Sequence, residues 1–156
     1  MSKFFKYLKV RNIDVLIYRM DEPVQVAFPR MQYLLQSKKM PDGKLNYFME
    51  DDGRFVHRSL VYGKLNVLKL VGKSGPAIGN CVTSEAYRGQ SIYPFVINNI
   101  ASKLLLKKKV SEVFIIVNSD NIASIRGIEK AGFELFAKVK AKRFLAFYFN
   151  KKIQKA

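Results

Sequence analysis

Residues 77–93 of this chain read AIGNCVTSEAYRGQSIY, and this stretch decides the organisation of the carboxyl-terminal half. The apolar residues at its start, 77–83, predict a short strand, and the polar residues 84–91 predict a loop. Apolar side chains then recur at helical spacing over 94–108, and Pro94 suits a first helical turn, where its missing N–H does no harm. A strand, a loop and a helix are therefore expected in that order.

The segment that follows supplies a second strand and a second helix. Residues 110–117 end in the run VFIIV, which is typical of a strand covered on both faces of a sheet. A short helix is expected at 122–131, and two closing strands at 133–139 and 144–149. A strand, a crossover helix and another strand place two strands in parallel. The fold class is therefore α/β, with a mixed, twisted sheet flanked by helices.

The amino-terminal half carries weaker signals. Asp21 resembles a helix start, and the helix is expected to continue through 26–36. No repeat, linker or low-complexity tract interrupts the chain, which predicts one domain spanning residues 1–156. Further strands are expected at 15–18 and 66–71, and a hairpin of strands at 45–50 and 54–62.

Composition narrows the classes of function. The 28 Lys and Arg residues outnumber 12 Asp and Glu, which gives a formal net charge of +16. This charge attracts polyanions such as nucleic acid, anionic membrane and coenzyme A, although a solvated lysine-rich surface is the simpler interpretation. The single cysteine, Cys81, and the single histidine, His57, exclude a disulfide framework and a Cys- or His-rich metal site. No apolar run approaches the ~20 residues that span a bilayer, so no membrane insertion and a cytoplasmic location are expected.

The turn before the first helix reads YRGQSIY over residues 87–93. Backbone N–H groups at a helix amino terminus lack partners, and the helix dipole favours negative charge there. Such a turn suits a pyrophosphate, with Arg88 as a charged neighbour. Taken alone, the turn is also compatible with an ordinary loop.

A second motif follows at 121–133, NIASIRGIEKAGF. The two motifs together resemble the GNAT superfamily of acyl-CoA N-acyltransferases, over about a third of the chain. The cofactor loop of that family is matched at Tyr87, Arg88, Gly89 and Ile92. Its second signature is matched at Asn121, Glu129, Lys130, Gly132 and Phe133.

The resemblance implies an N-acetyltransferase with acetyl-CoA as co-substrate and a central parallel strand pair that splays apart. Asn121 would lie near the pantetheine arm between the two strands, although Asn also suits a plain helix cap. Backbone groups of the first strand would pair with the pantetheine at Cys81, Val82 and Thr83. The loop would hold the pyrophosphate through Arg88, Gly89, Gln90, Ser91, Ile92 and Tyr93.

Three residues depart from the family pattern. Ser91 stands at a usual Gly position, where a positive φ would cost a Ser roughly 1 kcal/mol. Tyr93 stands at a Gly or Ala position, where its ring either narrows the groove or packs as a core aromatic. Ile128 stands where many members have a Tyr that protonates the departing thiolate. Another group or solvent must do so, or the protein binds acyl-CoA without efficient turnover.

The implied reaction needs a base to deprotonate the attacking amine. His57 is the first candidate because its unperturbed pKa lies near neutrality, and Glu85 is the second. A packing or surface histidine and an exposed loop carboxylate are the simpler interpretations. Cys81 is expected to be a small buried hydrophobe rather than a nucleophile.

The class of acceptor amine is inferred only from the net charge of the protein. A strongly basic protein favours a small neutral or anionic amine, such as an amino sugar, over a polyamine. Two other classes explain part of the sequence: a non-catalytic acyl-CoA-binding protein, and a basic nucleic-acid-binding module, for which no signature motif is present. Nucleic acid is therefore an unlikely partner, and a homodimer is left open.

Overall fold

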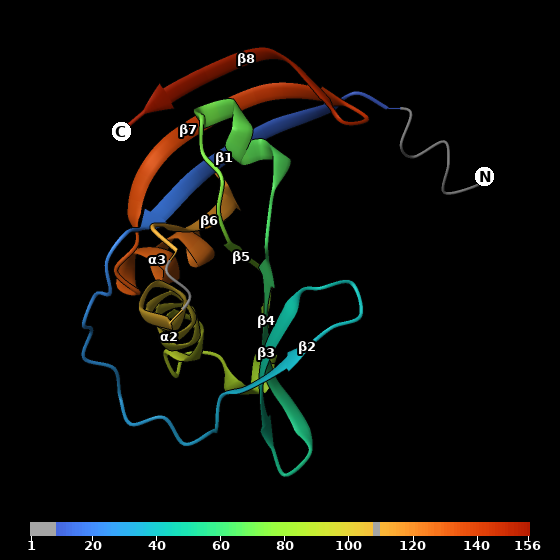
Figure 1. The fold of residues 1–156 in the computed structure, drawn as a ribbon. Coiled ribbons are helices and arrows are strands. Elements are labelled where there is room, and N and C mark those ends of the chain that lie inside the picture. The colour runs from blue at the N-terminus through green and yellow to red at the C-terminus, as the bar shows by residue number, and fades with distance from the viewer. Residues whose placement is uncertain (1–8, 108–109) are drawn as a thin grey trace, which may run out of the picture.

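The computed structural model describes residues 9–107 and 110–156. Over these residues the chain forms one eight-stranded sheet with the order β2-β3-β4-β5-β6-β1-β7-β8 (Figure 1). Neighbouring strands are antiparallel except β5 and β6, which are parallel. The strands are β1 (Arg11–Met20), β2 (Gln36–Lys39), β3 (Leu45–Asp51), β4 (Arg54–Tyr62), β5 (Ala77–Thr83), β6 (Val113–Asn118), β7 (Glu134–Phe144) and β8 (Phe147–Lys155).

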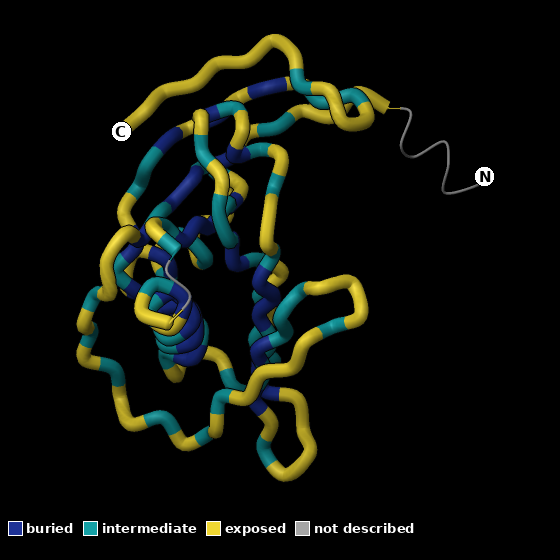
Figure 2. The backbone as a smooth tube through the Cα atoms, in the orientation of Figure 1, coloured by how far each residue is buried: buried dark blue, intermediate teal, exposed yellow. Residues whose placement is uncertain are grey.

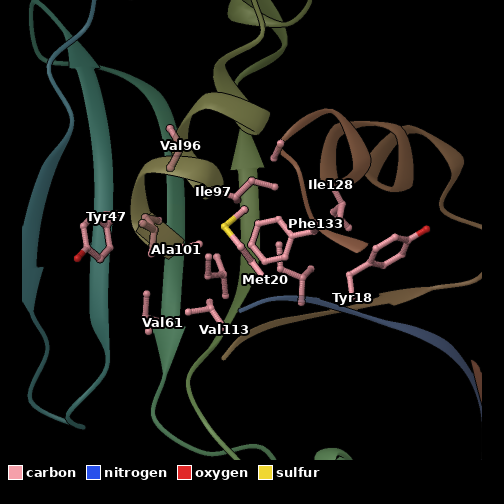
Figure 3. Packing of buried hydrophobic residues seen from close by; sticks show 14 of the residues in the cluster. Tyr18, Met20, Tyr47, Val61, Val96, Ile97, Ala101, Val113, Ile128 and Phe133 are labelled. Carbon is pink, nitrogen blue, oxygen red and sulfur yellow. The ribbon is translucent and has the colours of Figure 1, made fainter. Parts of the chain in front are cut away.

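Two α-helices, α2 (Ile92–Lys107) and α3 (Ile122–Lys130), lie together beside the sheet (Figure 1). The sides of the helices that face the strands are buried (Figure 2). Between helices and sheet lies the larger hydrophobic cluster, in which Met20, Ile97 and Phe133 meet (Figure 3). A smaller cluster, including Leu68 and Phe114, packs the 3-10 helix η1 (Asn66–Val71) against the sheet. The α/β class with a mixed sheet is confirmed.

The parallel pair supports a site because it is short. Strands β5 and β6 are in register at only two places, Ala77 opposite Phe114 and Ile78 opposite Ile115. Beyond these pairs β5 stays with β4, and one extra residue of β5 is inserted between the pairs Leu60–Gly79 and Arg58–Val82. This irregularity is a β-bulge, which bends a strand and locally ends its pairing. The two strands therefore part after their first residues, as the resemblance implied.

The predicted helix over 26–36 is wrong. Residues 21–35 form neither helix nor strand, and their path runs around the outside of α2 (Figure 1). Pro29 opposes a helix because its ring clashes with the preceding turn. The segment is held instead by a side chain, since Asn98 Nδ2 of α2 donates to the Val24 carbonyl at 2.8 Å and to the Ala131 carbonyl at 2.9 Å.

Two more sequence predictions need correction. Residues 66–71 form the 3-10 helix η1 rather than a strand, because Leu65, Leu68 and Val71 recur at the three-residue period of such a helix. The last strand was expected at 144–149, but the chain turns at Leu145, which has φ 53°, and β8 begins only at Phe147. The turn lacks the Gly or Asn that signals a tight hairpin.

Candidate active site

The turn between β5 and α2 opens into a cleft of about 700 Å³, and residues of α3 form its far wall. The structure thus gathers eight of the ten residues predicted to bind a cofactor. Gln90 and Asn121 do not line this cleft. The eight that do are Cys81, Val82, Thr83, Arg88, Gly89, Ser91, Ile92 and Tyr93.

Two residues give the turn its shape. Gly89 has φ 79° and Ser91 has φ 58°, so both occupy the left-handed region. The Ser91 carbonyl accepts from the Phe95 N–H at 3.1 Å, which begins the hydrogen-bond ladder of α2. Amides in the first turn of a helix have no intrahelical acceptor, so these donors are available to an anion at the cleft. Ser91 therefore adopts the positive φ that would be strained for a Ser at this position.

Two cations flank this turn. The Arg88 Nε donates to the Thr83 carbonyl at 3.2 Å, which fixes the side chain along the rim. Lys130 reaches across from the end of α3, and its Nζ donates to Ser91 Oγ at 2.6 Å. Lys130 belongs to the second motif, and the sequence alone does not predict a binding role for it. Its neighbour Glu129 points elsewhere, because its Oε1 accepts from the Tyr18 hydroxyl at 2.7 Å in the helix-to-sheet contact.

A second, smaller cavity of about 270 Å³ lies where β5 and β6 part. Asn80, Asn118 and Asn121 line it with polar groups. Asn121 also caps α3, since its Oδ1 accepts from the Ser124 N–H at 3.2 Å. The plain cap interpretation is therefore confirmed, and the same residue faces the gap between the strands.

Tyr93 stands between the two cavities and lines both. Its ring lies against the backbone of α3, because a Cβ added to Gly127 would come within 2.6 Å of Tyr93 Cδ1. On another side the ring centroid is 6.2 Å from that of His57. Burial raises the pKa of Tyr93 above its usual value, and the nearby Cys81 thiol acts in the same direction. The hydroxyl is therefore protonated at neutral pH, and burial makes it a weaker acid than a free tyrosine.

His57 lies beneath the cleft floor, fully buried, in a chain of hydrogen bonds. Its Nδ1 is 2.7 Å from Thr83 Oγ1 and its Nε2 is 2.8 Å from Ser59 Oγ, which donates to Cys81 Sγ at 3.1 Å. Because Ser59 gives its proton to Cys81, the neutral ring donates from Nε2 and accepts from the Thr83 hydroxyl. Burial lowers the pKa of His57 to about 4, so the ring is neutral at pH 7. It lines neither cavity, and its hydrogen bonds lead to the cleft residues Thr83, directly, and Cys81, through Ser59.

The remaining predicted residues differ in exposure. Glu85 belongs to a short 3-10 turn, is exposed, and does not line either cavity. Gln90 points away from the cleft, and its Oε1 lies 3.4 Å from the Tyr33 hydroxyl. The Cys81 thiol is enclosed, and burial raises its pKa to about 11 despite the opposing hydrogen bond from Ser59. Catalytic roles for His57 and Glu85 remain predictions.

Ile128, at the position of the family's proton donor, is fully buried in the larger cluster. It packs beside Tyr18 and Phe133 and contributes only apolar surface (Figure 3). Among the residues that the structure describes, no three His, Cys, Asp or Glu side chains gather as a metal site. None of the helices within 9–107 and 110–156 is long and apolar enough to cross a bilayer.

This architecture is that of the GNAT fold: a mixed sheet, a splayed parallel pair, and a turn that opens into a cleft at the start of the helix that follows. A solved structure of a GNAT-family protein from Novosphingobium aromaticivorans, named as a candidate acetyltransferase, has this fold with a TM-score of 0.60. The two sequences are 14% identical, and the match covers 86% of this chain and 65% of the other. No protein-family model and no curated protein matches the sequence.

Proposed function

We propose that this protein is an acyl-CoA-dependent N-acyltransferase. The observation that carries the proposal is the turn 88–91 at the start of α2, which places helix amides between Arg88 and Lys130 and opens toward the gap between β5 and β6. Unpartnered amides at a helix terminus bind phosphate, and cationic side chains strengthen that contact. A pyrophosphate is the ligand that such a turn fits.

The remaining cleft residues fit the rest of the co-substrate. Residues 81–83 of β5, beyond the short pairing with β6, would offer backbone groups to a pantetheine arm as an added strand does. The Thr83 carbonyl, which already accepts from Arg88, would not be one of these groups. The reacting thioester would then reach the smaller cavity past Tyr93. An N–H of the bulged strand is the natural donor to the oxyanion that forms when an amine attacks the thioester carbonyl.

The thiolate that leaves must acquire a proton, and Ile128 cannot supply one. Tyr93 lines both cavities with a protonated hydroxyl, which makes it the best-placed donor. The base is less well defined. His57 would act on an amine only through the Thr83 hydroxyl, and its pKa of about 4 makes it a weak base.

The acyl group and the acceptor extend the proposal. Acetyl-CoA is the donor that the sequence resemblance favours. The net charge of +16 favours a small neutral or anionic amine such as an amino sugar, because a polyamine is repelled at the cleft. A cytoplasmic location belongs to the same proposal, and a homodimer stays a prediction.

The first experiment measures thermal shifts with coenzyme A, acetyl-CoA and longer acyl-CoAs. A ligand at 100 times its Kd stabilises a protein by roughly 2.7 kcal/mol. Lys130→Gln should weaken coenzyme A binding about tenfold, because it removes a charge-assisted contact. Lys103→Gln, an exposed lysine of α2 outside the cleft, makes the same change in charge and should bind normally.

The second experiment measures thiol release with a panel of amines, from nucleotide-linked amino sugars to polyamines. Release with an amino sugar supports the full proposal, and a clear polyamine preference would refute the acceptor class. Binding without release from any amine would establish the second candidate, a non-catalytic acyl-CoA-binding protein, which the buried Ile128 favours. No stabilisation by any acyl-CoA would remove both.

A further inference from the structure

The end of β7, the turn and the start of β8 form a run of six apolar or aromatic residues, FLAFYF at 144–149, which we call the tip. Leu145 is 46% exposed, Phe147 73% and Phe149 38%. Phe147 is the cross-strand partner of Phe144, and Phe149 that of Lys142, so these side chains project from one face of the hairpin. An exposed apolar group of this kind marks an interaction surface.

The tip is held in one shape. Leu145 has φ 53°, and its carbonyl accepts from Arg143 Nε at 2.7 Å. The Arg143 guanidinium also lies 5.6 Å from the centre of the Tyr148 ring. The apolar side chains are therefore presented by an ordered turn, and little conformational entropy is lost when they bind.

The strands behind the tip are strongly basic. Residues 137–155 contain seven Lys and Arg and no Asp or Glu. Lys140 and Lys152 are direct cross-strand partners, an arrangement that is destabilising for like charges. Asp14 of β1 is 4.0 Å from Lys140 Nζ, with both side chains largely exposed, so it offsets little of this charge. A cluster of cations that repel one another indicates an anionic partner.

Three kinds of partner can be compared by whether they would cover the apolar tip and also neutralise the seven cations behind it. A second copy of the chain would cover the apolar tip but bring seven more cations against these seven. A nucleic acid strand would use the cations and stack on aromatic rings, yet it would leave aliphatic Leu145 uncovered. The surface of an anionic bilayer accepts both parts, since aromatic side chains settle at the headgroup level and lysines reach the lipid phosphates.

We propose that the β7–β8 hairpin docks the protein on anionic membrane surfaces, with the tip inserted at the interface and the lysines on the headgroups. A basic amphipathic helix is the usual device for such contact. Here the two ingredients, apolar insertion and basic attraction, are carried by consecutive residues of a hairpin. The turn lies away from α2 and α3 (Figure 1), so docking leaves the cleft open, and the inference stands without the proposed activity.

The test is co-sedimentation of the full chain with vesicles. Wild type should bind vesicles of equal parts phosphatidylserine and phosphatidylcholine, and bind pure phosphatidylcholine at least tenfold more weakly. Leu145→Ser with Phe147→Ser should lose at least tenfold, because both residues are exposed and make no core contact to disturb. Lys151→Gln with Lys152→Gln should lose about 25-fold, since each lysine near an anionic surface is worth about a fivefold change.

The matched control is Lys38→Gln with Lys39→Gln, an exposed lysine pair on β2 at the opposite edge of the sheet. It changes the net charge equally and should bind as wild type does, with far-UV circular dichroism confirming that every variant is folded. The proposal is overturned if wild type shows no phosphatidylserine preference or if the control loses as much as the Lys151 and Lys152 pair. It is also overturned if single-stranded oligonucleotides bind more tightly than vesicles, or if the Leu145 and Phe147 changes convert a dimer to a monomer.

Discussion

Replacing Gly127 by Ala tests the position of the ring that separates the two cavities. Gly127 lies within α3, and an added Cβ would come within 2.6 Å of Tyr93 Cδ1 and 2.9 Å of Cε1. Real Cβ atoms do not approach other heavy atoms so closely, so the ring must move. The buried His57 ring lies on another side of it, at a centroid distance of 6.2 Å, so the Tyr93 ring would shift toward the cavities that it lines.

Two opposing terms set the magnitude. In a helix, Ala is more favourable than Gly by about 1 kcal/mol. Forcing a methyl group against a packed ring costs about 1–3 kcal/mol. Gly127→Ala should therefore leave the free energy of unfolding unchanged or lower it by up to about 2 kcal/mol. When Tyr93 is already Ala, the clash is gone, and the same change should raise the free energy of unfolding by about 1 kcal/mol.

The assay is urea unfolding of the wild type, both single variants and the double variant, followed by circular dichroism. The double-mutant cycle should give a coupling of about 1–3 kcal/mol between Gly127 and Tyr93. Should Gly127→Ala stabilise both backgrounds equally, the ring does not rest on α3. Tyr93 would then not lie between the cavities, and its assignment as the proton donor, which depends on that position, would be refuted.

Three other changes probe the same region. Tyr93→Phe should leave coenzyme A binding intact and reduce thiol release by about 10²-fold or more, the usual contribution of a general acid; an unchanged rate would assign the proton to solvent. Because burial lowers the pKa of His57 from 6.5 to about 4, the unfolded chain binds the extra proton between these values. Wild type should thus lose up to about 3 kcal/mol of stability as the pH falls from 6.5 to 4, a loss absent from His57→Gln in urea unfolding at each pH. Burial raises the pKa of Cys81 from 9.0 to about 11, so iodoacetamide at pH 8 should modify the folded protein about 100-fold more slowly than the urea-unfolded chain.

The elements that the sequence predicts well are those whose signal is local. Strand β5, helix α2, strand β6 and helix α3 each carry their own periodicity and a cap or breaker at an end, and all four are present within a few residues of the expected bounds. The helix prediction for 26–36 gave too little weight to Pro29, and the path that the segment takes instead depends on Asn98, which is far away in sequence and donates to the Val24 carbonyl. No local pattern reports such a contact.

The residues of the candidate site also fall into two groups: those that a local motif predicts and those that only the folded structure brings to the cleft. Residues from Cys81 to Tyr93 were found together because they are consecutive on one turn. Lys130 and Gly127 contribute from α3, and only the spacing of the second motif hinted that this helix faces the cleft. The burial of His57 could not be predicted, because its strand reads RFVHRSLVY, which does not alternate polar and apolar residues and so does not indicate which side chains face the interior.

Ser91 and Tyr93, the two residues of the turn that depart from the family pattern, are both accommodated by contacts with residues of α3. The large ring of Tyr93, at a position where the resembled family has Gly or Ala, is met by Gly127, the residue that leaves room for it. Ser91, at a usual Gly position, keeps the left-handed φ of 58° and offers its hydroxyl to Lys130. Each substitution in the turn is therefore matched by a contact across the cleft. Restoring glycine at Ser91 alone would relieve backbone strain but strip Lys130 of its partner, so turn and helix must be altered together to recover the usual pattern.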